Sequence, residues 1–256
     1  MKIILPNLAL LCAAMLLLPS KGMLADPIQD GQSLAAELRA LQIGIPGDIS
    51  ATLKIRKSGG ERVQRQVQKQ SIQTEQGWND LFSVATDDQS NTEWLLIRHR
   101  NGESPSYQMA NSESIPMSNE DYQPLVKDAA MTPVGGSDFW VADLGLDFLH
   151  WPDQRIVPSR ITMRKGVACK VLESARPTQS ENGYYKVRSW ISSEYGGVVY
   201  AEAFDTAGQK IKIFEVNDVE KIDGQWYLKE LRIRNLRDRS TSTLEFNNSG
   251  QSLSNQ

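Results

Sequence analysis

Few residues of this sequence have the types and spacing that catalysis needs. The run Gly-Gly-Ser at 135–137 begins like the G-x-S-x-G elbow of a serine nucleophile, but Phe139 stands where the closing glycine belongs. The chain also contains no G-x-x-x-x-G-K-[ST] phosphate loop, no H-E-x-x-H motif and no C-x-x-C pair. We therefore expect a protein that is not an enzyme, with no catalytic residue and no cofactor.

The two histidines and one pair of acids are the remaining groups that could bind a metal ion or move protons. Neither His99 nor His150 has a cysteine or carboxylate at metal-ligand spacing, so we expect no metal site. His99 is predicted to be a polar residue at a strand edge, and His150 a hydrogen-bonded residue of the core or its rim. Asp143 and Asp147 lie four residues apart without a partner base, and we expect both on the solvated surface.

The first 25 residues have the order of a cleavable secretory signal. Lys2 follows the initial methionine, an apolar block covers 8–18, and Ala25 offers a small residue for cleavage. The block is shorter than the roughly 20 residues of a membrane-spanning helix. We expect residues 1–25 to be removed and the mature protein to work outside the cytoplasm.

The mature chain is predicted to contain one cysteine and an excess of acidic residues. Because its other cysteine lies in the leader, Cys169 has no partner for an internal disulfide. Its neighbours Val167 and Val171 share its face of a predicted strand, so we expect Cys169 to be a small buried hydrophobe. The formal net charge of the whole chain is −3, and loss of the leader's lysines makes it more negative, which argues against a nucleic-acid partner.

Hydrophobic periodicity predicts one helix followed by many strands. Leu34, Leu38 and Leu41 form an apolar stripe typical of a helix over 31–43. From residue 49 the period changes to two, with short turns between the segments, which predicts an antiparallel meander. The predicted strands are Ala51–Lys57, Arg62–Ile72, Asn79–Thr86, Thr92–Arg100, Arg160–Arg164, Gly166–Ala175, Tyr184–Ser192, Val198–Asp205, Gln209–Asn217, Gln225–Leu236 and Ser240–Phe246.

The segment between the two groups of strands loses this alternation. Residues 111–133 are predicted to be a long surface connection with a short helix near 121–130. Ser137 or Asp138 is expected to cap a second short helix that ends before Pro152. Residues 247–256 are polar and predict a frayed tail after a single domain at 26–246.

The strands predict a sheet with one dry and one wet face. In the run Lys-Ile-Lys-Ile at 210–213, strict alternation puts the isoleucines on one face and the lysines on the other. The run Leu-Arg-Ile-Arg at 231–234 follows the same rule, with arginine outside. A dry face that short helices only partly fill would leave a lipid-sized pocket, whereas ordinary core packing is the simpler interpretation of each side chain. The candidates for this lipid cavity are Trp190, Ile211, Ile213, Leu231 and Ile233.

The blocks 137–144 and 184–246, with the runs Ser-Asp-Phe at 137–139 and Ile-Asp-Gly at 222–224, resemble the LolA-like group of bacterial outer-membrane lipoprotein-sorting proteins. The segment 137–144, Ser-Asp-Phe-Trp-Val-Ala-Asp-Leu, is similar to the group's Gly-Ser-Asp-Phe-Ser-Tyr-x-Asp-Leu segment, with Trp140 and Val141 in place of Ser-Tyr. The second block, 184–246, repeats the group's order of a Trp-Ile strand, an Asp-x-x-Gly hairpin, an Ile-Asp-Gly-x-Trp hairpin and a final Leu-Glu-Phe strand.

The resemblance implies an α+β, mainly β fold: an incomplete antiparallel half-barrel of about ten or eleven strands. A few helices would cover its concave apolar face, and the protein would work in the periplasm. The leading hypothesis is a monomeric carrier that shields lipoprotein acyl chains or lipids, with inner- or outer-membrane proteins as partners. The alternative is a periplasmic sensor, regulator or interaction module that binds a membrane-protein segment. A hydrolase is the third hypothesis.

Overall fold

The computed structural model describes residues 26–40, 48–86, 91–116, 118–158, 162–176, 183–222 and 225–247. The predicted leader at 1–25 and residues 248–256 of the predicted tail lie outside this part of the chain, so both stay predictions.

Within the described residues, fourteen strands form one sheet. They are β1 (Asp48–Arg56), β2 (Arg62–Thr74), β3 (Gly77–Ala85), β4 (Thr92–Arg100), β5 (Ser106–Ser112), β6 (Gln123–Leu125), β7 (Asp153–Ile156), β8 (Thr162–Arg164), β9 (Val167–Ala175), β10 (Lys186–Ser192), β11 (Val198–Phe204), β12 (Lys210–Ile222), β13 (Gln225–Asn235) and β14 (Ser240–Asn247).

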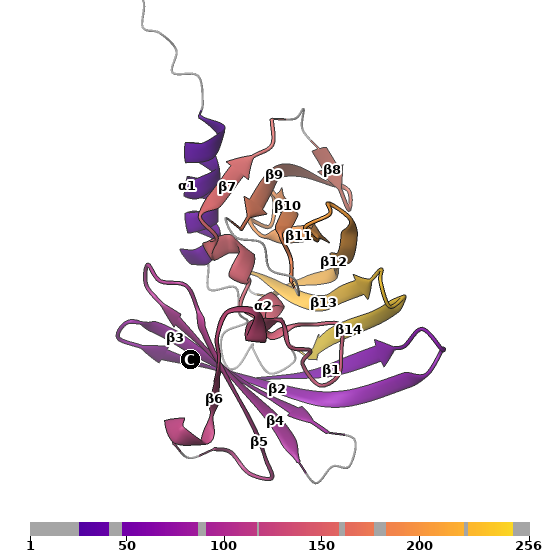
Figure 1. Ribbon diagram of the computed structural model, residues 1–256. Helices are drawn as coiled ribbons and strands as arrows, with labels where there is room; N and C mark the ends of the chain where they lie inside the picture. Colours follow the sequence, from indigo (N-terminus) through magenta and orange to yellow (C-terminus); the bar gives the residue numbers. More distant parts are fainter. Residues whose placement is uncertain are drawn as a thin grey trace, which may run out of the picture.

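The sheet consists of two antiparallel meanders that meet where β1 pairs with β14. Its strand order is β6-β5-β4-β3-β2-β1-β14-β13-β12-β11-β10-β9-β7, and β8 adds to β9. Figure 1 shows β1 to β6 fanning out on one side while β9 to β14 curl on the other. The sheet has two ends, at β6 and β7, and does not close into a barrel. The predicted mainly β, incomplete half-barrel fold is therefore confirmed.

The sheet has more strands than predicted because three short or polar segments escaped the period-two pattern. These are β5, β6 and β7. The expected short helix near 121–130 is confirmed only at its end, where Lys127–Met131 form a 3-10 helix, because β6 occupies its centre and pairs with β5. Pro124 is tolerated in β6 because this strand forms one end of the sheet.

Among the described residues, helical structure is limited to short elements and one long helix. The α-helices are α1 (Pro27–Ala40) and α2 (Val141–Leu144), and the 3-10 turns are η1 (Asn119–Asp121), η2 (Lys127–Met131) and η3 (Asp147–His150). The single long helix, α1, packs against β7, β9 and η3 (Figure 1). Among the described residues, no helix combines the length and apolar content required to cross a membrane.

The predicted apolar stripe of α1 is confirmed where it is described. Leu34 and Leu38 are buried, whereas Leu41 lies outside the described residues. The helix begins four residues earlier than predicted, at Pro27, and Asp26 accepts a hydrogen bond from the backbone N–H of Ile28 at 3.0 Å. Gly31 allows the close approach to β7, because a Cβ there would lie 2.6 Å from the Arg155 backbone.

Candidate functional site

The inner face of the sheet is the main apolar surface of the molecule. Leu53 and Ile97 from the first meander and Ile233 and Leu244 from the second belong to one buried cluster. Phe139 and the residues of α2 and η3 complete this cluster from the helical side. The apolar residues of both meanders thus face the same short helical elements, which lie between them in Figure 1. We call this layer, 137–150, the lid.

The five predicted cavity residues do not share one face. Ile211 and Ile233 belong to the inner cluster, and Leu231 packs against it. Trp190 and Ile213 instead belong to a second, separate cluster. The expectation that all five line one dry face is wrong, and only three of them point toward the lid side.

A bulge in β12 explains the position of Ile213. Phe204 pairs with Lys210 and Ala203 with Lys212, so Ile211 is an extra residue in the ladder. Beyond this bulge the alternation inverts: Lys212 points inward and Ile213 outward. The predicted solvent exposure of Lys212 is therefore wrong, because this residue is only 2% exposed.

Trp190 points outward because its strand alternates regularly. Val187 and Ile191 on β10 belong to the inner cluster, so Trp190 between them takes the other face. There the Arg164 guanidinium lies over the Trp190 ring at 4.7 Å and over the Tyr200 ring at 4.3 Å.

The outer cluster consists of apolar residues of β9 to β12. Its members are Val167, Cys169, Val171, Trp190, Val199, Tyr200 and Ile213. Cys169 is 5% exposed and packs here with the valines beside it. Its predicted role as a small buried hydrophobe is confirmed.

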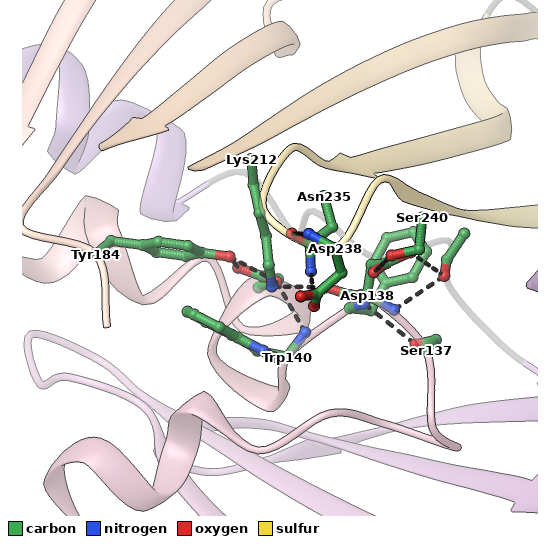
Figure 2. A network of polar contacts seen from close by, with 11 residues as sticks. Ser137, Asp138, Trp140, Tyr184, Lys212, Asn235, Asp238 and Ser240 are labelled. Carbon is green, nitrogen blue, oxygen red and sulfur yellow. Dashed lines mark hydrogen bonds and ion pairs between the residues drawn. The ribbon is translucent and has the colours of Figure 1, made fainter. Parts of the chain in front are cut away.

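A buried polar network attaches the lid to the sheet (Figure 2). The Lys212 ammonium donates a 2.6 Å hydrogen bond to the backbone carbonyl of Asp138 and lies 3.6 Å from the Asp143 carboxylate. It also lies 3.4 Å from the centre of the Trp140 ring. One inward lysine of β12 thereby contacts three residues of the lid.

Asp143 is the acidic centre of this network. Its carboxylate accepts hydrogen bonds from the Tyr184 hydroxyl at 2.8 Å and from the Trp140 backbone N–H at 2.8 Å. Burial raises the pKa of Asp143, while the charge of Lys212 opposes that rise. Burial also lowers the pKa of Lys212 to about 8, despite the neighbouring carboxylates of Asp143 and Asp138. The expected solvated surface position of Asp143 is wrong, because its side chain is 2% exposed.

Asp138 attaches the start of the lid to β14. Its carboxylate accepts hydrogen bonds from Ser240 at 2.5 Å and Ser242 at 2.8 Å, and its N–H donates to Ser242 at 2.9 Å. Ser137 accepts a 3.1 Å hydrogen bond from the N–H of Phe139. The expected helix cap by Ser137 or Asp138 is wrong, since Trp140 is the N-cap residue of α2.

A second buried polar cluster lies within the first meander. Asp80 contacts Lys69 at 2.9 Å, Ser71 at 2.5 Å and His99 at 3.3 Å. Burial alone would raise the pKa of Asp80, but the contacts with His99 and Lys69 outweigh it and lower the pKa to about 2. His99 also stacks on Trp78 at 4.4 Å.

Both histidines line one small pocket of about 30 Å³ beside Leu38 of α1. His99 pairs with Trp78 of β3 but lies beyond Arg98, the last residue of β4 that pairs with β5, so its predicted strand-edge position is confirmed. The predicted rim position of His150 agrees with its partial burial, which lowers its pKa to about 4. The described residues contain no group of three or more His, Cys, Asp or Glu side chains that could hold a metal ion.

Sequence reasoning missed the lid network. The segment 137–144 was singled out by its resemblance to a family, but Lys212 and Tyr184 gave no signal. They lie far from it in the chain, and the inward turn of Lys212 depends on a one-residue bulge that strict alternation does not predict.

Comparison with known proteins identifies the fold. A DUF1329 family protein from Desulfovibrio piger is 17% identical, with a TM-score of 0.67 over 88% of this chain and 92% of that chain. An outer membrane lipoprotein-sorting protein domain from Vibrio parahaemolyticus is 18% identical, with a TM-score of 0.65 over 85% and 90%. A LolA superfamily protein from Nitrosomonas europaea is 15% identical, with a TM-score of 0.59 over 87% and 92%.

At these identities the structural matches establish a LolA-like fold. No curated protein matches the sequence. A family model described as that of an uncharacterized protein matches residues 121–252, which is just over half of the chain and includes the lid and the second meander. The chain therefore belongs to this uncharacterized-protein family.

Proposed function

We propose that this protein is a non-enzymatic periplasmic carrier that shields the acyl chains of a lipoprotein or lipid against the inner face of its half-barrel. The observation behind the proposal is that short helical segments, rather than a second sheet, cover the apolar inner face. The LolA-like fold supports it, since one structural neighbour is described as an outer membrane lipoprotein-sorting domain.

An acyl chain would bind by displacing the lid. Phe139 and Val141 are 1% and 0% exposed, so lid side chains fill the place that the cargo would take. Burial of each CH₂ group of the cargo contributes about 0.8 kcal/mol, and exposure of the lid's own apolar side chains on opening offsets part of that gain. Such a balance suits a carrier, which must release its cargo as well as bind it.

Three of the predicted residues remain in the proposed cargo surface: Ile211, Leu231 and Ile233. Trp190 and Ile213 are not included, because their cluster is separate from the one beneath the lid. Leu231 suits a test best, since it is only partly buried. Lys229 on the same strand is exposed and belongs neither to the inner cluster nor to a pocket lining, so it offers a matched control.

Lipid analysis tests the proposal directly. Protein purified from an envelope extract should contain lipid by mass spectrometry and should bind a fluorescent acyl probe. Leu231→Gln should weaken probe binding by about tenfold, whereas the control Lys229→Gln should leave it unchanged. Absence of both co-purified lipid and probe binding would refute the proposal. Stoichiometric capture of one membrane protein without lipid would favour an interaction module instead.

A further inference from the structure

The outer face carries a basic pocket where the two meanders join. A cavity of about 530 Å³ is lined by residues of β1, β2, β13 and β14. The lining residues are Lys54, Ile55, Arg56, Arg62, Val63, Gln64, Arg232, Arg234, Thr241 and Thr243. Five of these ten residues are cationic and none is acidic. The chain as a whole has a net charge of −3, so this pocket opposes the average charge of the molecule.

The strand register gathers these cations in two rows. Across β2, β1, β14 and β13, one row has the order Arg62, Arg56, Thr241 and Arg234. The next row has the order Gln64, Lys54, Thr243 and Arg232. Both rows alternate with inner-cluster residues such as Leu53 and Ile233, so their polar side chains lie on the face opposite the lid.

Three of the five cations have carboxylate partners outside the pocket. Lys54 pairs with Glu245 at 2.6 Å, Arg232 with Glu230 at 2.9 Å and Arg234 with Glu215 at 3.2 Å. These pairs are at least one-third exposed on the cationic side, so each cation still faces solvent.

Arg56 and Arg62 differ from these three cations. They are directly opposite each other on β1 and β2, and both are exposed. No described acidic residue pairs with either one. Like charges directly opposite in a sheet are destabilising, so the fold gains nothing from this pair. Two arginines paired across neighbouring strands without an acidic partner suit a bound oxyanion such as phosphate.

We propose that this pocket binds the phosphate group of an anionic lipid headgroup. Its volume suits a small polar headgroup, and threonine hydroxyls of β14 add neutral donors between the cations. The site lies on the face opposite the inner apolar cluster, so it can contact a membrane surface while the inner face remains free. The inference does not depend on the carrier function, and each can fail without the other.

Vesicle binding tests this site. The full sequence is expressed, and the protein that accumulates in the cells is purified for the measurement. The protein should bind vesicles of phosphatidylglycerol mixed with phosphatidylcholine, and should not bind vesicles of phosphatidylcholine alone. Arg56→Gln/Arg62→Gln should weaken binding about thirtyfold, because each cation near an anionic surface contributes about 1 kcal/mol. High salt should also weaken it, since the contact is between exposed charges.

The matched control is Lys165→Gln/Lys170→Gln, which removes two exposed positive charges from outside the pocket. This control should bind vesicles like the wild type. The Arg56/Arg62 variant should unfold at the same temperature as the wild type or a higher one, which separates lost binding from lost folding. Arg56→Lys/Arg62→Lys should retain part of the affinity.

Inorganic phosphate separates the two sources of the ligand group. We expect inorganic phosphate to compete weakly with vesicles for the wild-type protein. Loss of both phosphate binding and vesicle binding in Arg56→Gln/Arg62→Gln would support the headgroup site. Phosphate binding without any vesicle binding would overturn the lipid assignment. Vesicle binding that the double glutamine variant retains in full would overturn the site itself.

Discussion

Each meander of this sheet contributes a lysine to a buried lysine–aspartate pair among the described residues, and the two pairs differ in where the aspartate lies. Lys69 and Asp80 lie on neighbouring strands at 2.9 Å, and Ser71 and His99 also contact the carboxylate. Lys212 and Asp143 are 3.6 Å apart and connect β12 to the lid. The first pair is confined to the sheet, whereas the second joins two layers.

The surroundings shift the pKa values of Asp80 and Asp143 in opposite directions. The pKa of Asp80 falls to about 2, so this carboxylate stays charged over the physiological range. Burial raises the pKa of Asp143 and lowers that of Lys212 to about 8, so both members of the lid pair are closer to their neutral forms. The sheet pair thus behaves as a fixed part of the fold, and the lid pair as a contact that can be released at a smaller free-energy cost.

The largest effect should follow loss of the sheet carboxylate. Asp80→Ala leaves Lys69 buried without its charge partner, and we expect the free energy of unfolding to fall by about 3–5 kcal/mol. Urea unfolding followed by tryptophan fluorescence measures this change. Exposed Asp153→Ala serves as the control and should have little effect. A loss below about 1 kcal/mol for Asp80→Ala would contradict the structural role of the pair.

The pH dependence of stability should separate the two pairs. The folded pKa of Asp80 is about 2 against its ordinary 3.8, so its contribution is complete above pH 3.8 and disappears as the pH falls toward 2. The folded pKa of Lys212 is about 8 against its ordinary 10.5. Between these values the unfolded chain binds the proton that the folded chain has lost, so this lysine makes stability rise with pH.

Unfolding measured across pH in matched variants tests these signs. Across its own pH window, each group should change the free energy of unfolding by on the order of 2–3 kcal/mol. Asp80→Ala should flatten the acid limb of the stability curve, and Lys212→Met should flatten the rise above pH 8. Identical curves for the wild type and Lys212→Met above pH 8 would show that this lysine keeps an ordinary pKa.

Removal of the lid lysine should have a smaller effect than loss of Asp80. In Lys212→Met, Asp143 keeps its hydrogen bonds from Tyr184 and the Trp140 N–H, and its raised pKa allows it to take up a proton. We expect the free energy of unfolding to fall by about 1–2 kcal/mol.

Hydrogen exchange can show whether this loss is local to the lid. Amides of 139–145 should exchange faster in Lys212→Met, while those of β2 and β3 keep their wild-type rates. Faster exchange throughout both meanders would contradict a lid contact that opens independently of the sheet.

The contrast between these pairs also shows how far the sequence predicts this molecule. Period-two alternation identified most strands and their antiparallel order, because it reflects burial of one face by local neighbours. It missed β6 and β7, which are too short to show a period, and the polar strand β5. It also placed Lys212 and Ile213 on the wrong faces, because one extra residue in β12 inverts every side chain beyond it.

The buried polar networks could not be predicted from the sequence for a different reason, which is that their members lie far apart in the chain. Asp143 finds its partners Tyr184 and Lys212 only through the fold, so a carboxylate that resembles a solvated residue in the sequence becomes buried. The edge position of His99 could be predicted from its place at the end of a strand, but its contact with Asp80 on the neighbouring strand could not. The family resemblance located the lid segment but not the residues that hold it.

The smallest effects are expected from two serine variants, one beside Asp80 in the sheet and one beside Asp138 of the lid. The Ser71 hydroxyl donates to Asp80 and accepts from Lys69, but these two side chains contact each other directly at 2.9 Å. We therefore expect Ser71→Ala to cost only about 0.5 kcal/mol. Ser242→Ala should cost more, about 1 kcal/mol or slightly above, because Ser242 is fully buried and its loss removes the hydrogen bonds to both the carboxylate and the N–H of Asp138. Denaturant unfolding of the two variants side by side measures the difference. If Ser71→Ala proved the more damaging, the sheet pair would depend on its hydroxyl rather than on its charges, and its contrast with the lid pair would have to be revised.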